Sequence, residues 1–277
     1  MNAQQLFDQI RSKRSFLCIG LDSDIAKIPE LLLTKHDPVF EFNKVIIDAT
    51  AEYVVAYKPN LAFYEHRGAA GWNTLYKTVS YIKKNHPNIF TIADAKRGDI
   101  ANTAKMYADA FFKTFNFDAI TLSPYMGHDT VEPFLRHNNK WAILLALTSN
   151  SSYDDFQIIK NADTGKYLYE EIISKSIHWG TENNMMFVVG ATRSDMLANV
   201  RKLVPDHFLL VPGVGEQGGS LSEVAKHGLD SKCGLLVNSA RAIIYADRSM
   251  RFAGAAKTAA MILQKEMEKI LKDAGLL

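Results

Sequence analysis

The sequence has little of what disulfide-stapled, membrane-spanning or metal-clustered proteins need. Only 2 of its 277 residues are cysteines, Cys18 and Cys233, and both lie in apolar runs without C-x-x-C spacing, which excludes a disulfide framework and a zinc ribbon. No apolar run approaches the ~18 residues of a membrane span, and the polar start predicts no signal peptide. The 8 histidines are scattered without an H-E-x-x-H motif, so no metal site is predicted. We therefore expect a cytoplasmic protein with no membrane partner.

An excess of charge of one sign is also absent. Lys and Arg total 32 against 30 for Asp and Glu, a net charge of +2, and the two signs are interspersed along the chain. This pattern excludes a basic stripe that follows a nucleic-acid backbone, so no nucleic-acid partner is expected and any anion site must be local. With 47% hydrophobic and 22% charged residues, the composition is that of an ordinary globular protein.

Short, nearly continuous apolar runs that alternate with helical patterns dominate what is present. Such runs are typical of parallel strands buried on both faces, and the length suits one barrel of roughly 250 residues. The sequence therefore predicts the α/β class, with a single-domain (β/α)8 TIM barrel over 1–277 and a short N-terminal helix at 3–12. The predicted strands are 16–22, 53–60, 89–93, 118–122, 141–148, 186–190, 208–211 and 234–238, and further helices are predicted at 39–52, 65–84, 101–115, within 165–180 and over most of 255–274.

The stretch from Asp94 to Ile100 concentrates charge where the third predicted strand ends. Alternate side chains of a strand point the same way, so Asp94 and Lys96 are expected to project into one space. An isolated pair with this spacing is more often a surface ion pair. Here, however, polar residues follow other strands too, and barrel active sites lie at the carboxyl ends of the strands. The polar residues at the predicted strand ends are Asp22, Lys58, Asn60, Asp94, Lys96, Ser123, Ser149, Gln217 and Arg241.

A phosphate site is predicted where strands seven and eight end. The glycine-rich run 212–219 follows strand seven, and 238–242 follows strand eight. Glycines let backbone N–H groups approach an anion, and an arginine adds bidentate donors. Gln217 and Arg241 are the predicted phosphate ligands. In the alternative interpretation, the glycines only turn the chain and Arg241 pairs with a surface carboxylate.

Together these segments resemble the orotidine 5′-monophosphate decarboxylase family, especially its longer bacterial branch, over nearly the whole barrel. A D-x-K-x-x-D motif alone is shared with sister enzymes such as 3-keto-gulonate-phosphate decarboxylase and hexulose-phosphate synthase. Its combination with 57–60 and 212–219 is more specific. The matching pieces are 20–22, 40–43, 57–60, 94–100, 123–127, 148–150, 189–192, 212–219 and 238–241.

The resemblance implies a carboxy-lyase that converts orotidine 5′-monophosphate to uridine 5′-monophosphate (UMP) and CO2 without metal or organic cofactor. It also implies a homodimer with shared sites, in which Asp99 and Thr103 reach the ribose bound by the partner subunit. Lys96 matches the proton donor. The implied catalytic residues are Lys58, Asp94, Lys96 and Asp99; the implied ribose ligands are Asp22, Lys58, Asp99 and Thr103; Ser149 and Pro212 would contact the base, and Gln217 and Arg241 the phosphate.

Two departures from the family pattern concern base recognition. Ser151 and Ser152 stand where this branch usually has Pro-Gly, and Ser123 stands where Asn is usual. Three other functions stay open. They are a sister decarboxylase or aldolase that acts on a sugar phosphate with Mg²⁺, a class I aldolase that uses Lys58 or Lys96 as a Schiff base, and a non-catalytic sensor of a phosphate ligand.

Overall fold

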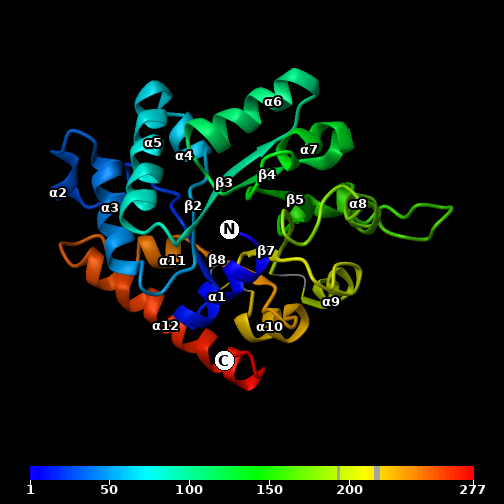
Figure 1. The fold of residues 1–277 in the computed structure, drawn as a ribbon. Coiled ribbons are helices and arrows are strands. Elements are labelled where there is room, and N and C mark those ends of the chain that lie inside the picture. Colours follow the sequence, from blue (N-terminus) through cyan, green and yellow to red (C-terminus); the bar gives the residue numbers. More distant parts are fainter. Residues whose placement is uncertain (192–193, 215–218) are drawn as a thin grey trace.

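A closed barrel of parallel strands forms the centre of the molecule (Figure 1). The computed structural model describes residues 1–191, 194–214 and 219–277. Each strand pairs with the next along the chain, and the last pairs with the first through Leu17 with Val237 and Cys18 with Asn238. The predicted (β/α)8 fold is thus confirmed. The strands are β1 (Leu17–Gly20), β2 (Ala56–Lys58), β3 (Phe90–Arg97), β4 (Ala119–Leu122), β5 (Trp141–Leu147), β6 (Met185–Val189), β7 (Leu209–Pro212) and β8 (Leu235–Ser239).

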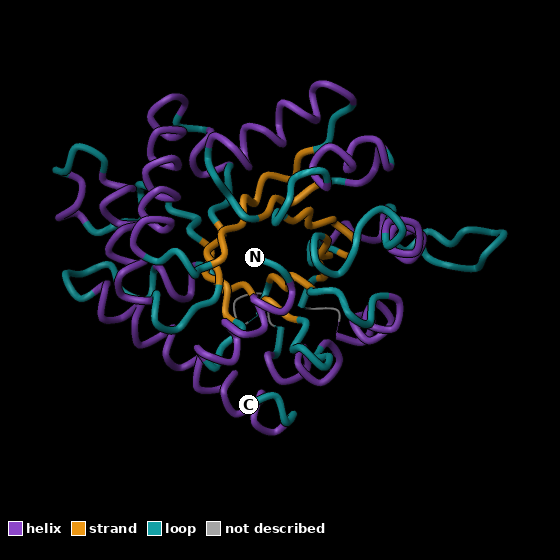
Figure 2. The backbone as a smooth tube through the Cα atoms, viewed as in Figure 1, coloured by secondary structure: helices purple, strands orange, loops and turns teal. Residues whose placement is uncertain are grey.

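Helices form an outer ring around the strands (Figure 2). At least one helix follows every strand, as the right-handed crossover between parallel neighbours requires. The helices are α1 (Ala3–Lys13), α2 (Glu30–Leu33), α3 (Pro38–Thr50), α4 (Ala62–Glu65), α5 (Gly68–Asn85), α6 (Ala101–Asp109), α7 (His128–Leu135), α8 (Leu168–Ser176), α9 (Ser194–Leu203), α10 (Leu221–Gly228), α11 (Arg241–Ile244) and α12 (Phe252–Asp273), and shorter turns cover Ala110–Thr114, Pro124–Met126 and Ser151–Asp155.

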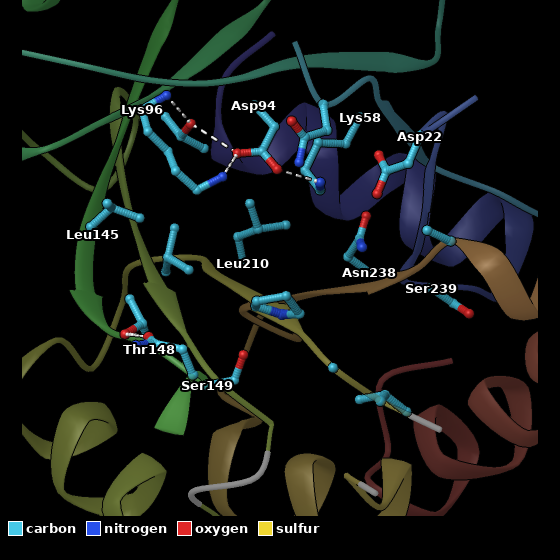
Figure 3. Close-up of a pocket in the computed structure, with 18 of the residues that line it drawn as sticks. Asp22, Lys58, Asp94, Lys96, Leu145, Thr148, Ser149, Leu210, Asn238 and Ser239 are labelled. Atoms are coloured by element: carbon cyan, nitrogen blue, oxygen red, sulfur yellow. Dashed lines mark hydrogen bonds and ion pairs between the residues drawn. The ribbon is translucent and has the colours of Figure 1, made fainter. Parts of the chain in front are cut away.

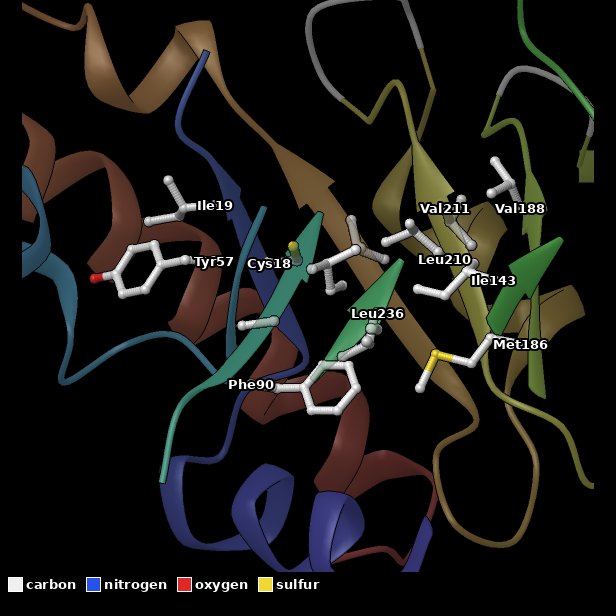
Figure 4. Close-up of a cluster of buried hydrophobic side chains, with 14 of the residues drawn as sticks. Cys18, Ile19, Tyr57, Phe90, Ile143, Met186, Val188, Leu210, Val211 and Leu236 are labelled. Carbon is white, nitrogen blue, oxygen red and sulfur yellow. The ribbon is translucent and has the colours of Figure 1, made fainter. Parts of the chain in front are cut away.

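Large apolar side chains fill the amino end of the barrel. Trp141 meets Phe90 and Phe208 edge to face, with ring centroids 6.2 and 6.5 Å apart. The indole Nε1 of Trp141 donates to the carbonyl oxygen of Met1 at 2.7 Å, so the N-terminus lies over the barrel centre (Figure 1). Further apolar side chains pack beside Phe90 in Figure 4, among them Met186. Because this end is filled, a ligand can enter only at the carboxyl ends of the strands.

The predicted N-terminal helix is confirmed as α1. Asn2 begins it with a capping box, in which its side chain accepts from the N–H of Gln5 while the Gln5 side chain accepts from the N–H of Asn2, each at 2.9 Å. Leu6 and Ile10, four residues apart, are fully buried, as expected for one face of an amphipathic helix. No helix within the described ranges is long and apolar enough to cross a membrane.

Several boundaries differ from the sequence prediction; for example, the strand predicted at 53–60 covers only Ala56–Lys58. The helix predicted at 65–84 is interrupted near its start: α4 ends at Glu65, and α5 begins at Gly68, whose φ of +59° glycine tolerates without strain. The third strand extends beyond the predicted 89–93 to Arg97, and its pairing with β4 shifts register between Ala93 and Arg97. This irregularity in the pairing changes the direction of the side chains in the charged stretch.

Candidate active site

A cavity of about 460 Å³ opens at the carboxyl ends of the strands. In Figure 3 the charged side chains lie along one side, Thr148 and Ser149 lie on the other, and Leu145 and Leu210 lie between them. Seven of the predicted site residues therefore share one cavity: Asp22, Lys58, Asp94, Lys96, Ser149, Pro212 and Arg241. The remaining lining residues are Asn60, Thr121, Leu145, Thr148, Asn150, Val188, Leu210, Gly213, Val214, Asn238, Ser239 and Ala240.

One buried carboxylate holds two lysines. Lys58 Nζ lies 2.7 Å from Asp94 Oδ2, and Lys96 Nζ binds Asp94 Oδ1. Lys58 and Asp94 are buried, whereas the Lys96 side chain is 49% exposed. Asp94 thus pairs with both lysines through its two oxygens.

The pairing sets the protonation of the buried groups. Burial alone would raise the pKa of Asp94, but the charges of Lys58 and Lys96 and their hydrogen bonds lower it well below its ordinary value. Burial alone would likewise lower the pKa of Lys58, and the charges of Asp94 and Asp22 raise it above its ordinary value. Both groups are therefore charged at neutral pH, Asp94 as a carboxylate and Lys58 as an ammonium.

Asp22 extends the charged wall beyond Lys58. Burial raises the pKa of Asp22; Lys58 opposes this rise and Asp94 adds to it. Asp22 lines the cavity. Among the described residues, its buried Oδ1 has no hydrogen-bond donor, which is unfavourable for a buried acceptor.

Thr121 of β4 joins the array, although the sequence analysis gave it no role. Its Oγ1 accepts the N–H groups of Ala95 and Lys96 at 3.0 and 2.9 Å and donates to Asp94 Oδ1 at 3.2 Å. One hydroxyl thus fixes both the backbone at Lys96 and the carboxylate that binds Lys96. A threonine within an apolar strand gives no sign of this role, because the contact depends on the register of two strands.

The backbone at Lys96 is strained. Its φ of +48° lies in the left-handed region, which β-strand residues with a Cβ rarely adopt. Arg97 supports this conformation: its Nη1 donates to the carbonyl oxygen of Ala95 at 2.8 Å, and its Nη2 pairs with Glu65 of α4. The guanidinium also lies 5.5 Å from the ring centre of Tyr107. The contacts of Arg97 therefore stabilise the strained backbone at Lys96, so that the Lys96 side chain points into the cavity.

The phosphate prediction is tested only in part. Pro212 ends β7 and lines the cavity, and Gly213 follows with a φ of +97°. Arg241, at the start of α11, also lines the cavity. Gln217 lies outside the described residues.

Asp99 and Thr103 do not line the cavity of their own subunit. Asp99 is half-buried just after β3, where its Oδ1 accepts the N–H of Ile100 at 2.8 Å, and Thr103 is exposed on α6. Their roles across a subunit interface stay predictions. Within the described residues, no group of three or more His, Cys, Asp or Glu side chains is placed to hold a metal ion.

The barrel and its charged cavity define an enzyme of the (β/α)8 class. The model of the orotidine 5′-phosphate decarboxylase / HUMPS family matches residues 15–255, so the chain belongs to this family. An orotidine 5′-phosphate decarboxylase of Phocaeicola vulgatus is 58% identical over 98% of this chain and 99% of its own length. One of Porphyromonas gingivalis is 53% identical over 100% of both chains. The solved structure of Leishmania donovani OMP decarboxylase matches with a TM-score of 0.83 and 38% identity, over 98% of each chain.

Proposed function

We propose that this chain decarboxylates orotidine 5′-monophosphate to UMP and CO2, the last step of de novo pyrimidine biosynthesis, without metal or organic cofactor. The observation that carries the proposal is the Lys96 ammonium, bound to Asp94 and facing the cavity, in a chain whose full-length relatives bear this enzyme's name. We further propose that 1–277 acts as one domain in the cytoplasm. Loss of orotidine 5′-monophosphate, followed by absorbance with purified protein in EDTA, tests the reaction.

The residue types suit the chemistry of this reaction. Loss of CO2 breaks the bond between C6 and the carboxylate carbon and leaves the electron pair on C6, where no ring carbonyl can delocalise it. A fixed cation beside C6 stabilises that charge in the transition state. Lys96 then donates a proton from Nζ to C6, as a positioned general acid. Because its side chain is about half exposed, it can recover the proton from water.

Asp94 has two roles in this scheme. It raises the pKa of Lys58 and fixes the Lys58 and Lys96 side chains in the cavity. It also brings a negative charge close to the substrate carboxylate, a contact that loss of CO2 relieves. Asp22 and Lys58 both line the cavity and would bind the ribose hydroxyls.

Replacing Arg241 by alanine is expected to raise KM roughly 10- to 100-fold, because an arginine–phosphate contact combines charge with two hydrogen bonds. The same substitution should lower kcat/KM, because binding energy from the phosphate contact helps to stabilise the transition state at C6, although C6 is distant from the phosphate. Steady-state kinetics with circular dichroism measures both effects. Arg136→Ala, at an exposed site that directly follows α7 and lies outside the cavity, is the matched control. Unchanged kinetics in a folded Arg241→Ala protein would contradict the phosphate assignment.

A homodimer with shared sites is also part of the proposal. If Asp99 serves the partner's ribose, Lys96→Ala and Asp99→Ala subunits form heterodimers with one intact site and one doubly damaged site. Random exchange makes about half of the dimers mixed, so mixing two inactive proteins should restore about a quarter of wild-type activity. Exchange is verified with differently tagged subunits. Verified exchange without recovery of activity would show that the sites are not shared.

A further inference from the structure

The Gln157 side chain clamps the end of β5. Gln157 lies between the turn Ser151–Asp155 and α8, in the segment that projects from the barrel beside α8 (Figure 1). Its Oε1 accepts the N–H of Thr148 at 2.8 Å, and its Nε2 donates to Thr148 Oγ1 at 2.7 Å. A backbone N–H can only donate, so it fixes which end of the amide faces Thr148.

The contact with Gln157 determines which atoms donate and which accept in the hydrogen bond between Thr148 and Asn150. Because Thr148 Oγ1 already accepts from Gln157, its own hydrogen is directed to Asn150 Oδ1, 2.5 Å away. The Asn150 amide oxygen is thereby occupied, and its Nδ2 is the part of the side chain that has hydrogens to donate. Asn150 and Thr148 both line the cavity. The Asn150 and Thr148 oxygens each already take part in one hydrogen bond, so the Asn150 Nδ2 group is the donor that this pair has left for a ligand.

Ser149 is held between these two residues and against Gly190. A Cβ on Gly190 would approach the Cβ and the backbone nitrogen of Ser149 to 2.8 and 2.9 Å, a distance that real Cβ atoms do not reach, so only glycine fits. The N–H of Gly190 donates to the carbonyl oxygen of Leu147 at 2.9 Å. Ser149 therefore has β6 on one side and the clamped residues on the other.

Gln157 acts from outside the cavity, since it is not among the lining residues. Its own backbone is anchored: its N–H donates to the carbonyl oxygen of Tyr153 at 2.9 Å, and its carbonyl accepts the N–H of Tyr169 at 3.1 Å. This anchoring does not depend on a ligand. Gln157 is thus built as a fixed support that acts through Thr148.

We infer that Gln157 is a positioning residue that makes the Thr148–Asn150 wall selective for a pyrimidine with a carbonyl group at C4 over one with an amino group. A C4 carbonyl accepts hydrogen bonds and suits the free Asn150 Nδ2 donor, whereas a C4 amino group donates and would compete for the Thr148 and Asn150 oxygens, which are already engaged. The inference deepens the proposed function and rests on it for the choice of a pyrimidine nucleotide as ligand.

The test compares three inhibitors of the enzyme. UMP and cytidine 5′-monophosphate (CMP) differ only at the edge of the base, and ribose 5-phosphate has no base.

Two substitutions of Gln157 remove its action on Thr148. Gln157→Met keeps the length of the side chain and removes both hydrogen bonds. Gln157→Glu keeps an acceptor for the Thr148 N–H but makes the Thr148 hydroxyl donate to the new carboxylate, which turns the hydrogen away from Asn150. Asn161→Ala is the control for loosening of the same segment, because the Asn161 side chain bonds Glu171 and the N–H of Asp163, and no other partner among the described residues.

Wild-type protein should bind UMP more tightly than CMP. Both Gln157 variants should weaken UMP binding by about tenfold, the effect of one well-placed hydrogen bond, and leave ribose 5-phosphate unchanged. Asn161→Ala should leave all three inhibition constants unchanged. An unaltered UMP-to-CMP ratio in both Gln157 variants, equal weakening of ribose 5-phosphate, or the same change in Asn161→Ala would overturn the inference. Absence of decarboxylation by wild-type protein would instead refute the proposed function; the UMP-to-CMP ratio of dissociation constants, measured directly by isothermal titration calorimetry, would still decide the role of Gln157.

Discussion

Replacing Lys96 by alanine is expected to lower kcat by about 10⁴-fold or more, because one side chain both stabilises the C6 carbanion and protonates it. Stability should change by less than about 1 kcal/mol, because the Lys96 side chain is about half exposed and ion pairs of exposed side chains contribute little. Single-turnover kinetics, with UMP as the measured product, gives the loss of rate. Urea unfolding gives the change in the free energy of unfolding.

Lys105→Ala is the matched control for this loss. Lys105 is an exposed lysine of α6 outside the cavity, so its removal changes net charge equally and should leave kcat within about twofold of wild type. A folded Lys96→Ala protein with kcat within tenfold of wild type would contradict the role of Lys96 as proton donor.

Replacing Asp94 by asparagine is expected to remove most activity and to lower the free energy of unfolding by about 3–5 kcal/mol at pH 7. The substitution keeps the volume of the side chain, but it leaves the buried Lys58 ammonium without its contact at 2.7 Å. Urea unfolding measures the loss. Asp163→Asn, at an exposed site, is the control and should change stability by less than about 0.5 kcal/mol. Equal stability of the Asp94→Asn and wild-type proteins would contradict a buried ion pair.

The stability difference between these two proteins should depend on pH with a definite sign. The pKa of Asp94 is lowered in the folded protein, so its stabilising effect is present above the ordinary Asp value of about 3.9 and is lost as pH falls through the folded value. The pKa of Lys58 is raised, so its effect is present below about 10.4 and is lost as pH rises through the folded value. The difference should therefore be flat between about pH 5 and 9 and shrink outside that range.

The sequence predicted that Asp94 and Lys96 share one space, and the structure confirms it by a different route. Regular strand alternation was the stated reason, but the register of β3 shifts after Ala93 and Lys96 has a φ of +48°. Such an irregularity inside a charged stretch cannot be seen from hydrophobic periodicity, because its support comes from Thr121 and Arg97. The sequence was sufficient to predict that both side chains face the cavity, but not the backbone conformation that turns them there.

Residues that act through others were the least predictable part of the site. Thr121 looks like one polar position in an apolar strand, and Gln157 lies in a connecting segment beyond the end of β5. Charged residues at strand ends stand out in a sequence, since burying them without a partner is unfavourable. Neutral hydrogen-bonding residues give no such signal, because their partners are set by strand register and loop path.

The most direct test of the account is an absorbance assay with purified protein, orotidine 5′-monophosphate and excess EDTA. The account predicts full conversion to UMP and CO2 at a rate that EDTA does not change, and no turnover by Lys96→Ala protein under the same conditions. Absence of turnover by wild-type protein, or activity that EDTA abolishes and Mg²⁺ restores, would contradict it.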